Sequence, residues 1–232
     1  MKKNTLFLAA ASLLASLPSV HADASLFISD GTHSVTIADG SALDSSSLVG
    51  VITYNGLLDA SSPWSVNVTT GISKPFLGSA TSPFMDLNSV NVSSTAGGNL
   101  TIEFSDNNFG PLPPGTFTSE IGGSTFGSVS FQTYVDLGNG LFAKTTPLGN
   151  VTFDETPFSS ATISERPTSG PFSMTIATTI SHDANQVRPT SFNASFYDTS
   201  TQVPEPSTVS LLALGVIGGI WMASRSRKNK SA

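Results

Sequence analysis

The sequence has 232 residues, no cysteine and a formal net charge of −6 at pH 7. Without cysteine, disulfides and thiolate metal sites are excluded, so the stability of the fold must come from packing. The charge is unevenly distributed, because six of the ten basic residues lie at the two ends of the chain. Residues 23–202 therefore carry four basic and fifteen acidic residues. Such an acidic segment argues against nucleic acid as a partner and against docking on anionic lipid.

The first 22 residues have the layout of a secretory signal peptide. A short basic start is followed by an apolar run from Leu6 to Leu14, which is too short for a membrane anchor. Val20 and Ala22 are residues of suitable size for the minus-three and minus-one positions of a signal-peptidase site. We expect signal peptidase to cleave after Ala22, with Ala24 as the alternative, and the remaining chain to be exported.

Residues 23–198 consist of short alternating runs separated by turn residues. Leu100, Ile102 and Phe104 show the period of two, which places successive side chains on opposite faces of a half-buried antiparallel strand. Asp30-Gly31 and Asn55-Gly56 are typical of the turns between such strands. The expected strands lie at 26–28, 34–38, 48–54, 64–70, 87–93, 99–105, 126–137, 140–144, 172–181 and 191–197.

About ten strands without an amphipathic helical period predict an all-β fold, an antiparallel β-sandwich of the jelly-roll type. Residues 147–170 contain prolines and charges but few strand signals, and we expect a long edge loop there. Residues 199–202 are interpreted as a linker. The order of the strands within the sheets is not predicted.

Few residues of this domain offer catalytic or metal chemistry. His33 and His182 are too few for a histidine-based metal cluster, and both are expected to be exposed residues at strand ends. Asp106 and Asn108 could present oxygen atoms to Ca²⁺, although turns rich in Asp and Asn usually need no metal. We therefore expect no cofactor and no metal site.

If the protein were a glycosidase, Glu103 and Glu120 could be its pair of catalytic carboxylates, but nothing in the sequence places them together. An enzyme is therefore not expected. The rings of Trp64, Tyr54 and Tyr134, and also that of Tyr197, could stack on sugars. The alternative is that Trp64 belongs to the core, as the many Phe residues in alternating runs do.

An uncharged apolar run occupies residues 207–223. As a helix it would be about 25 Å long at about 1.5 Å per residue, the short end of what crosses a hydrocarbon core about 30 Å thick. A single strand would leave its backbone unpaired in lipid. We expect one transmembrane helix at about 207–223, and a basic tail at 224–232 that stays cytoplasmic. The basic residues of that tail are Arg225, Arg227, Lys228 and Lys230.

Val203, Pro204, Glu205 and Pro206 directly precede the apolar run. This order of tripeptide, apolar span and basic stop over residues 203–232 resembles the PEP-CTERM protein-sorting domain. The resemblance implies that Pro204, Glu205 and Pro206 are recognised by exosortase, a membrane-bound transpeptidase-like enzyme of Gram-negative bacteria. It also implies an inner-membrane-anchored precursor that later reaches the cell surface or the extracellular matrix.

The resemblance further implies an association with exopolysaccharide and biofilm. We therefore expect an exported surface or matrix protein with a structural or interaction role. The alternative is a carbohydrate-binding, lectin-like module that uses exposed aromatic rings, and a glycoside hydrolase is the least favoured class.

Overall fold

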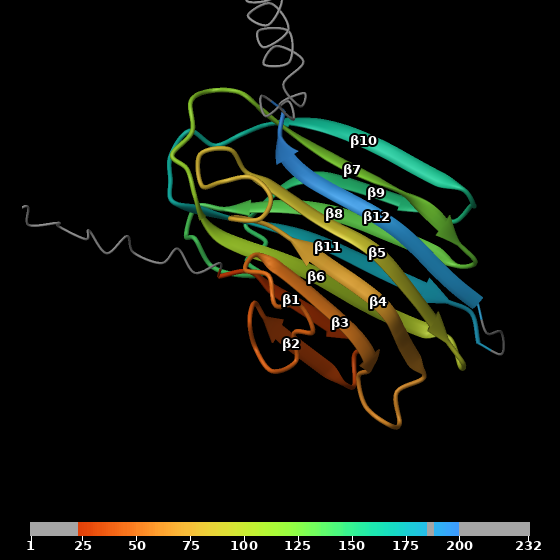
Figure 1. Ribbon diagram of the computed structural model, residues 1–232. Coiled ribbons are helices and arrows are strands. Elements are labelled where there is room, and N and C mark those ends of the chain that lie inside the picture. Colours follow the sequence, from red (N-terminus) through yellow and green to blue (C-terminus); the bar gives the residue numbers. More distant parts are fainter. Residues whose placement is uncertain (1–22, 185–187, 200–232) are drawn as a thin grey trace, which may run out of the picture.

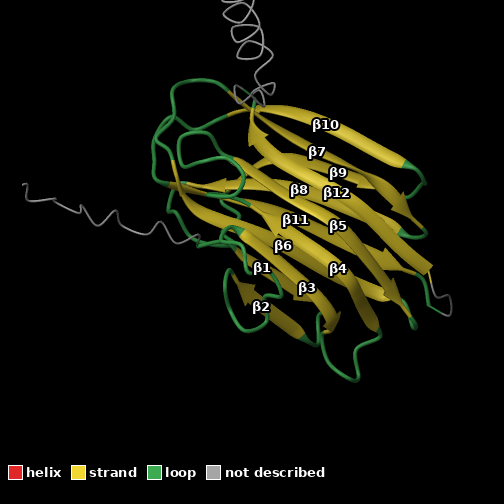
Figure 2. Cartoon of the chain, viewed as in Figure 1, coloured by secondary structure: helices red, strands yellow, loops and turns green. Residues whose placement is uncertain are grey.

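The computed structural model describes residues 23–184 and 188–199, which form two six-stranded antiparallel sheets packed face to face (Figures 1 and 2). Within these ranges the regular structure consists of strands only. The strands are β1 (Ser25–Ser29), β2 (Ser34–Ala38), β3 (Val51–Leu57), β4 (Trp64–Ile72), β5 (Phe84–Ser94), β6 (Gly98–Phe109), β7 (Thr116–Thr125), β8 (Ser128–Asp136), β9 (Thr146–Phe153), β10 (Phe158–Glu165), β11 (Phe172–His182) and β12 (Arg188–Asp198).

The first sheet has the order β2-β1-β6-β11-β8-β9, and the second has the order β10-β7-β12-β5-β4-β3. From β5 to β12 the chain changes sheets at every connection except the β8–β9 hairpin, and β12 returns to lie between β5 and β7. This is jelly-roll connectivity, with β1 to β4 extending the two sheets on one side. The predicted all-β sandwich of jelly-roll type is therefore confirmed.

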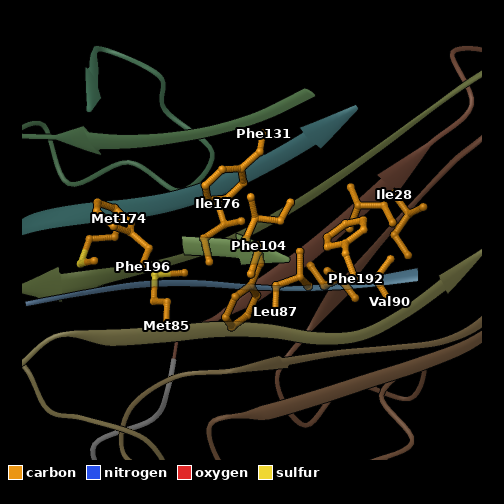
Figure 3. Close-up of a cluster of buried hydrophobic side chains, with 14 of the residues drawn as sticks. Ile28, Met85, Leu87, Val90, Phe104, Phe131, Met174, Ile176, Phe192 and Phe196 are labelled. Atoms are coloured by element: carbon orange, nitrogen blue, oxygen red, sulfur yellow. The ribbon is translucent and has the colours of Figure 1, made fainter. Parts of the chain in front are cut away.

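The core lies between the sheets and is filled by alternate residues of each strand (Figure 3). Phe104 and Ile176 point inward from the first sheet, while Leu87 and Phe196 point inward from the second, and all four are fully buried. Each such side chain contributes about 1.5–3 kcal/mol by leaving water. The alternation seen in the sequence is therefore the physical basis of the sandwich.

Four local predictions differ from the structure. β7 was not expected, because its Ser, Thr and Gly residues hide the alternation of Phe117, Ser119 and Ile121. β9 and β10 replace most of the expected loop at 147–170. Pro147 is tolerated there because β9 is an edge strand. The expected strand at 140–144 is instead part of the β8–β9 loop. Asn55-Gly56 lies inside β3 beside a bulge rather than in a turn.

Both ends of the described chain lie at the same end of the sandwich. Ser25 pairs with Ser105 near the close of β6, and Asp198 pairs with Phe117 near the start of β7. We call this the exit end; it comprises Asp23, Thr199 and the loops 39–50, 73–83, 110–115, 137–145 and 166–171. The far end comprises the turns 30–33, 58–63, 95–97, 126–127 and 154–157 and the residues that follow β11.

No helix in the described part of the chain is long and apolar enough to cross a membrane. The signal peptide expected at residues 1–22 lies outside the described residues. The same holds for linker positions 200–202 and for the tail at 203–232 with its expected transmembrane helix.

Candidate functional site

A hollow of about 670 Å³ opens on the outer face of the second sheet, over β10, β7 and β12. Its lining includes the small residues Gly122, Ser159 and Ala161 together with Asn193, and its one charged lining residue is Glu120. A Cβ atom placed on Gly122 would have no neighbour closer than 3.7 Å, so the space above this glycine is open. Small side chains on three adjacent strands thus create the hollow.

The antiparallel register explains how the hollow acquires its polar groups. Ala161, Glu120, Ser195 and Asp86 lie in one row across β10, β7, β12 and β5. Their chain neighbours point the other way, into the core, because successive strand residues alternate between faces. Polar residues from three strands that are distant in the sequence therefore meet on one outer surface.

Hydrogen bonds fix the two carboxylates of this row. The Tyr197 hydroxyl donates to Glu120 Oε1 at 2.9 Å, and the Ser195 hydroxyl donates to Asp86 Oδ1 at 3.0 Å. The Asn88 amide donates to the other oxygen of Asp86 at 2.8 Å. Burial raises the pKa of Tyr197, and its bond to the Glu120 carboxylate raises it further, so the phenol stays a donor.

The hollow therefore offers one oriented carboxylate, Glu120, together with hydroxyl and amide groups in its lining, and the Glu120 carboxylate is held by the neighbouring Tyr197. The Tyr197 ring is stacked on Phe84, with centroids 4.8 Å apart and planes 11° from parallel. Carboxylate and amide groups bind hydroxyl groups well, and an aromatic ring can cover the apolar face of a sugar. With Glu120 and no basic residue in its lining, the hollow suits an uncharged polyhydroxylated ligand better than an anionic one.

Two of the aromatic residues predicted to stack on sugars are inside the fold. Trp64 is 1% exposed and Tyr54 is 8% exposed, and the Tyr54 hydroxyl donates to the Leu57 carbonyl at 2.8 Å. Because neither ring offers a free face, the structure contradicts the stacking interpretation for both, and the core alternative holds for Trp64. Tyr134 is half-buried on the outer face of the first sheet, and its hydroxyl donates to Gln132.

His182 is not the exposed residue that we expected. Its ring is 4% exposed and packs against the Trp64 indole, with centroids 4.9 Å apart. Its Nε2 lies 2.8 Å from the Thr190 hydroxyl. His182 therefore belongs to the packed far end of the sandwich.

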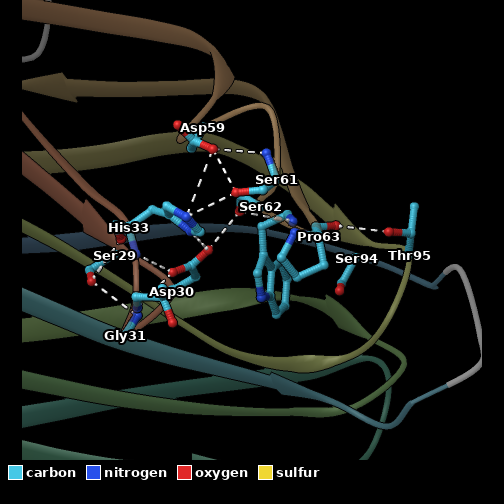
Figure 4. Close-up of polar contacts among 12 residues, drawn as sticks. Ser29, Asp30, Gly31, His33, Asp59, Ser61, Ser62, Pro63, Ser94 and Thr95 are labelled. Atoms are coloured by element: carbon cyan, nitrogen blue, oxygen red, sulfur yellow. Dashed lines mark hydrogen bonds and ion pairs between the residues drawn. The ribbon is translucent and has the colours of Figure 1, made fainter.

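His33 is half-buried and belongs to a hydrogen-bonded cluster at the far end (Figure 4). Its Nδ1 lies 3.0 Å from Asp30 Oδ2, and its Nε2 lies 3.1 Å from the Ser61 hydroxyl. Asp30 also accepts a bond from the Ser62 hydroxyl at 2.7 Å. The cluster ties the β1–β2 turn to the β3–β4 turn. Among the described residues, no group of three or more His, Cys, Asp or Glu side chains could hold a metal ion.

The calcium interpretation of Asp106 and Asn108 is not supported by the structure. Asp106 is fully buried in β6, and its Oδ2 accepts from Lys74 Nζ and from the Ser73 hydroxyl, both at 2.7 Å. The Asn108 amide donates to Asp23 Oδ2 at 2.9 Å. The Asp106 carboxylate is thus neutralised by a buried ammonium group rather than presented to a cation.

Glu103 and Glu120 do not form a glycosidase pair. Glu103 lies on the outer face of the first sheet, where it accepts from Lys144 Nζ at 2.5 Å. Glu120 lies on the outer face of the second sheet, so the whole sandwich separates the two carboxylates. A shared sugar cannot reach both.

The sequence predicted the components of the hollow only in part. The sequence identifies Tyr197 as a candidate aromatic residue and Glu120 as a candidate acid, but it does not predict their contact. The contact depends on the pairing of Ser195 with Glu120 and Asp86, and the alternation within single strands does not specify such pairing. The two glycines of β7 were the available signal, since a glycine in a strand often marks close approach or open space.

Comparison with solved structures finds remote likenesses to β-sandwich domains. A carbohydrate-binding module, TmCBM61 in complex with β-1,4-galactotriose, is 11% identical, with a TM-score of 0.29 over 58% of this chain and 86% of its own. A carbohydrate-binding module from the β-sandwich superfamily is 10% identical, with a TM-score of 0.31 over 71% of this chain and 64% of its own. A cleaved adhesin domain of Lys-gingipain from Porphyromonas gingivalis is 10% identical, with a TM-score of 0.27 over 68% of this chain and 95% of its own. These likenesses carry no information on a ligand of this chain.

Comparison with curated proteins gives no match. Residues 202–228 match the PEP-CTERM protein-sorting motif, which contains the predicted Val203, Pro204, Glu205 and Pro206. The motif marks an exported, membrane-anchored precursor that is processed by exosortase, a membrane enzyme. The chain is therefore a secreted or cell-surface β-sandwich protein that carries a PEP-CTERM protein-sorting motif.

Proposed function

We propose that the protein is a non-enzymatic component of the cell surface or extracellular matrix that associates with exopolysaccharide once its tail has been processed. The observation that carries the proposal is the sorting motif at residues 202–228, which follows a β-sandwich domain. A domain that is delivered outside and has a stable, hydroxyl-rich surface suits a structural or interaction role in a hydrated matrix.

A second function is favoured by the hollow itself. Glu120 and Asp86 are held by hydrogen bonds from the neighbouring strand β12, and Tyr197, the donor to Glu120, is stacked on Phe84. Preorganised acceptors of this kind lose little freedom when a sugar hydroxyl binds. We therefore propose that the outer face of the second sheet binds a neutral polysaccharide directly.

The sorting step can be tested with one pair of variants. Glu205→Gln should leave export intact but trap a membrane-bound, unprocessed form in a host that carries exosortase. Glu165→Gln changes an exposed glutamate of β10 outside the motif and should mature normally. If Glu205→Gln matures like the wild type, the carboxylate is not part of the signal.

The matrix role is tested by fractionation of the host. The mature protein should co-sediment with the exopolysaccharide and be released when that polysaccharide is digested. Recovery of all the mature protein as free polypeptide in the culture medium would contradict the association.

Direct binding is tested with purified residues 23–199, which contain both sheets and the core between them. Affinity electrophoresis through neutral and acidic polysaccharides should show retardation by a neutral one. Tyr197→Phe and Gly122→Val should weaken that retardation, because the first frees Glu120 and the second fills the hollow. Tyr134→Phe removes an equivalent hydroxyl from the opposite sheet and should bind like the wild type. If Tyr197→Phe and Gly122→Val are retarded as strongly as the wild type and Tyr134→Phe, the hollow is not the binding site.

A further inference from the structure

Exposed apolar side chains gather at the exit end of the sandwich. Of the eight large hydrophobic residues that are exposed in the described chain, five lie on exit-end loops, each between 52% and 56% exposed. We call them the exit-end surface: Leu43, Leu48, Val49, Phe76 and Leu137. Exposed apolar residues scattered singly are normal, so a shared surface requires that the loops carrying these five residues be joined.

The loop that carries three of these residues is held in place by hydrogen bonds. The Asp44 carboxylate accepts from the backbone N–H groups of Gly40, Ser46 and Thr53 at 3.0, 2.9 and 2.9 Å. A turn also closes between the Val51 N–H group and the Leu48 carbonyl at 3.1 Å. Leu43, Leu48 and Val49 are therefore displayed by an ordered loop.

Neighbouring exit-end loops are bonded to one another. The Ser73 N–H group donates to the Gly50 carbonyl at 2.8 Å, which joins loop 39–50 to loop 73–83. Lys74 Nζ donates to the Asn107 carbonyl at 2.6 Å, which joins loop 73–83 to the end of β6. Asn108 and Asn139 exchange two bonds of 2.8 Å, which adds loop 137–145. The five apolar residues thus stand on one connected set of loops.

Two ion pairs of the exit end are buried, whereas Asp23 and Lys144 at the same end are exposed. Lys74 pairs with Asp106, and Arg166 pairs with Asp198; none of the four side chains is more than 6% exposed. At the far end, in contrast, Asp154, Glu155 and Asp183 are exposed and line an acidic hollow. The far end therefore carries a cluster of exposed carboxylates, whereas two ion pairs of the exit end are shielded from solvent.

The exit end is also the end that the sorting tail holds near the membrane. Thr199 is fixed at this end, because its N–H group donates to the Thr116 carbonyl at 2.9 Å. Nine residues, 200–208, separate it from Val209, the first apolar residue of the uncharged stretch 207–223. Even fully extended at about 3.3–3.6 Å per residue, they span only about 30 Å. In the anchored precursor, the exit end is therefore held within about 30 Å of the bilayer, because the tether is attached there.

We propose that the exit-end surface rests on the lipid bilayer while the precursor is anchored, and that it leaves the bilayer when the tail is removed. A few half-exposed side chains bind lipid weakly by themselves, so the contact needs the tether to raise the local concentration. Its partner is the apolar-to-headgroup boundary of a neutral bilayer, because the surface offers no cluster of basic residues for anionic headgroups.

The test uses the full chain reconstituted in phosphatidylcholine vesicles. Because the sequence has no cysteine, Leu48→Cys, Phe76→Cys and Leu57→Cys can each be labelled with an environment-sensitive fluorophore. Leu57 is the matched control, since it is 54% exposed but lies at the far end. Labels at positions 48 and 76 should shift to shorter emission wavelengths and be quenched by spin-labelled lipid, whereas the label at 57 should remain water-like.

Water-like emission at all three positions would overturn the proposal. So would a blue shift at positions 48 and 76 that persists in lipid-free residues 23–199 and grows with protein concentration, because it would assign the surface to a second copy of the chain. A double variant, Leu48→Glu with Phe76→Glu, should make a label at Leu137→Cys water-like, and Leu57→Glu should not. An unchanged blue shift at position 137 in the double variant would also contradict a shared lipid contact.

Discussion

Asp30 shows how a single carboxylate can order one end of the sandwich. Its side chain is 5% exposed and accepts backbone N–H groups from Thr32 at 2.8 Å and from His33 at 2.6 Å, besides the Ser62 hydroxyl. Burial opposes ionisation, but the bonds from His33, Ser62 and Thr32 outweigh it and hold the pKa of Asp30 well below its usual range. The ionised form is therefore the one that stabilises the fold.

The sign of the pH dependence follows from that lowered pKa. A carboxyl group whose pKa is lower in the folded state contributes stability above its unfolded pKa of about 3.9, and loses it as pH falls through the folded pKa. Asp30→Asn should therefore lower the free energy of unfolding at pH 7 by about 1–3 kcal/mol. The difference from the wild type should shrink below about pH 4. Urea unfolding at pH 7, 5, 3 and 2 measures both effects.

Asp39 supplies the control, because its pKa moves in the other direction. Burial raises it, and the negative charges of Asp44 and Asp106 add to the effect. Its contribution to stability is present at low pH and is lost as pH rises through the folded pKa. Asp39→Asn keeps an acceptor for the Gly50 N–H group and should not lower the unfolding free energy at pH 7. A loss equal to that of Asp30→Asn would contradict the assignment.

At the scale of elements, the buried Lys74–Asp106 pair joins the β4–β5 loop to β6. The ammonium group also lies 4.3 Å from the centre of the Phe109 ring. Lys74→Met should destabilise the protein by about 3–5 kcal/mol, because it leaves a buried carboxylate without its cation. Adding Asp106→Leu should recover much of that loss, since a buried ion pair is often replaceable by apolar groups. Urea unfolding of both single variants and the double variant measures the coupling energy of the pair. If the two single losses of unfolding free energy simply add in the double variant, the ion-pair argument is contradicted.

The spacing between the sheets depends on a glycine in β4. A Cβ atom on Gly71 would lie 2.6 Å from two ring carbons of Phe104, which belongs to the opposite sheet. Gly71→Ala should therefore lower the unfolding free energy by about 1–3 kcal/mol through overpacking. Gly122→Ala, on the open outer face, should change it by less than about 0.5 kcal/mol. Thermal melts of the two variants test this, and similar melting temperatures would contradict the packing argument.

The sequence predicted the elements whose alternation involves large apolar residues and missed those that lack them. The inward positions of β6 and β11, such as Phe104 and Ile176, are apolar, and the period of two is plain. In β10 the residues between Phe158 and Glu165 are mostly small and polar, because this edge strand has little core to fill. Hydrophobic periodicity reports burial, so a strand with little buried surface gives little signal.

At the scale of the whole molecule, the sandwich carries exposed apolar residues at its exit end and an acidic hollow at its far end, and the hollow beside Glu120 lies on the outer face of the second sheet. The class of fold and the sorting motif could be predicted from the sequence, because each depends on local pattern. The hollow beside Glu120 and Tyr197 could not be predicted, because it depends on which strands are neighbours. The burial of Trp64 was open for the same reason, since one aromatic residue in a strand fits either face.

For the whole molecule, we expect that the folded domain is delivered by the sorting motif at residues 202–228 and by the signal peptide predicted at residues 1–22. Mass spectrometry of the protein recovered from the envelope and medium of an exosortase-carrying host tests this directly. We predict a mature chain that begins at Asp23 and lacks the apolar run at 207–223. Recovery of the intact polypeptide, from Met1 to Ala232, as the stable form in that host would contradict the account.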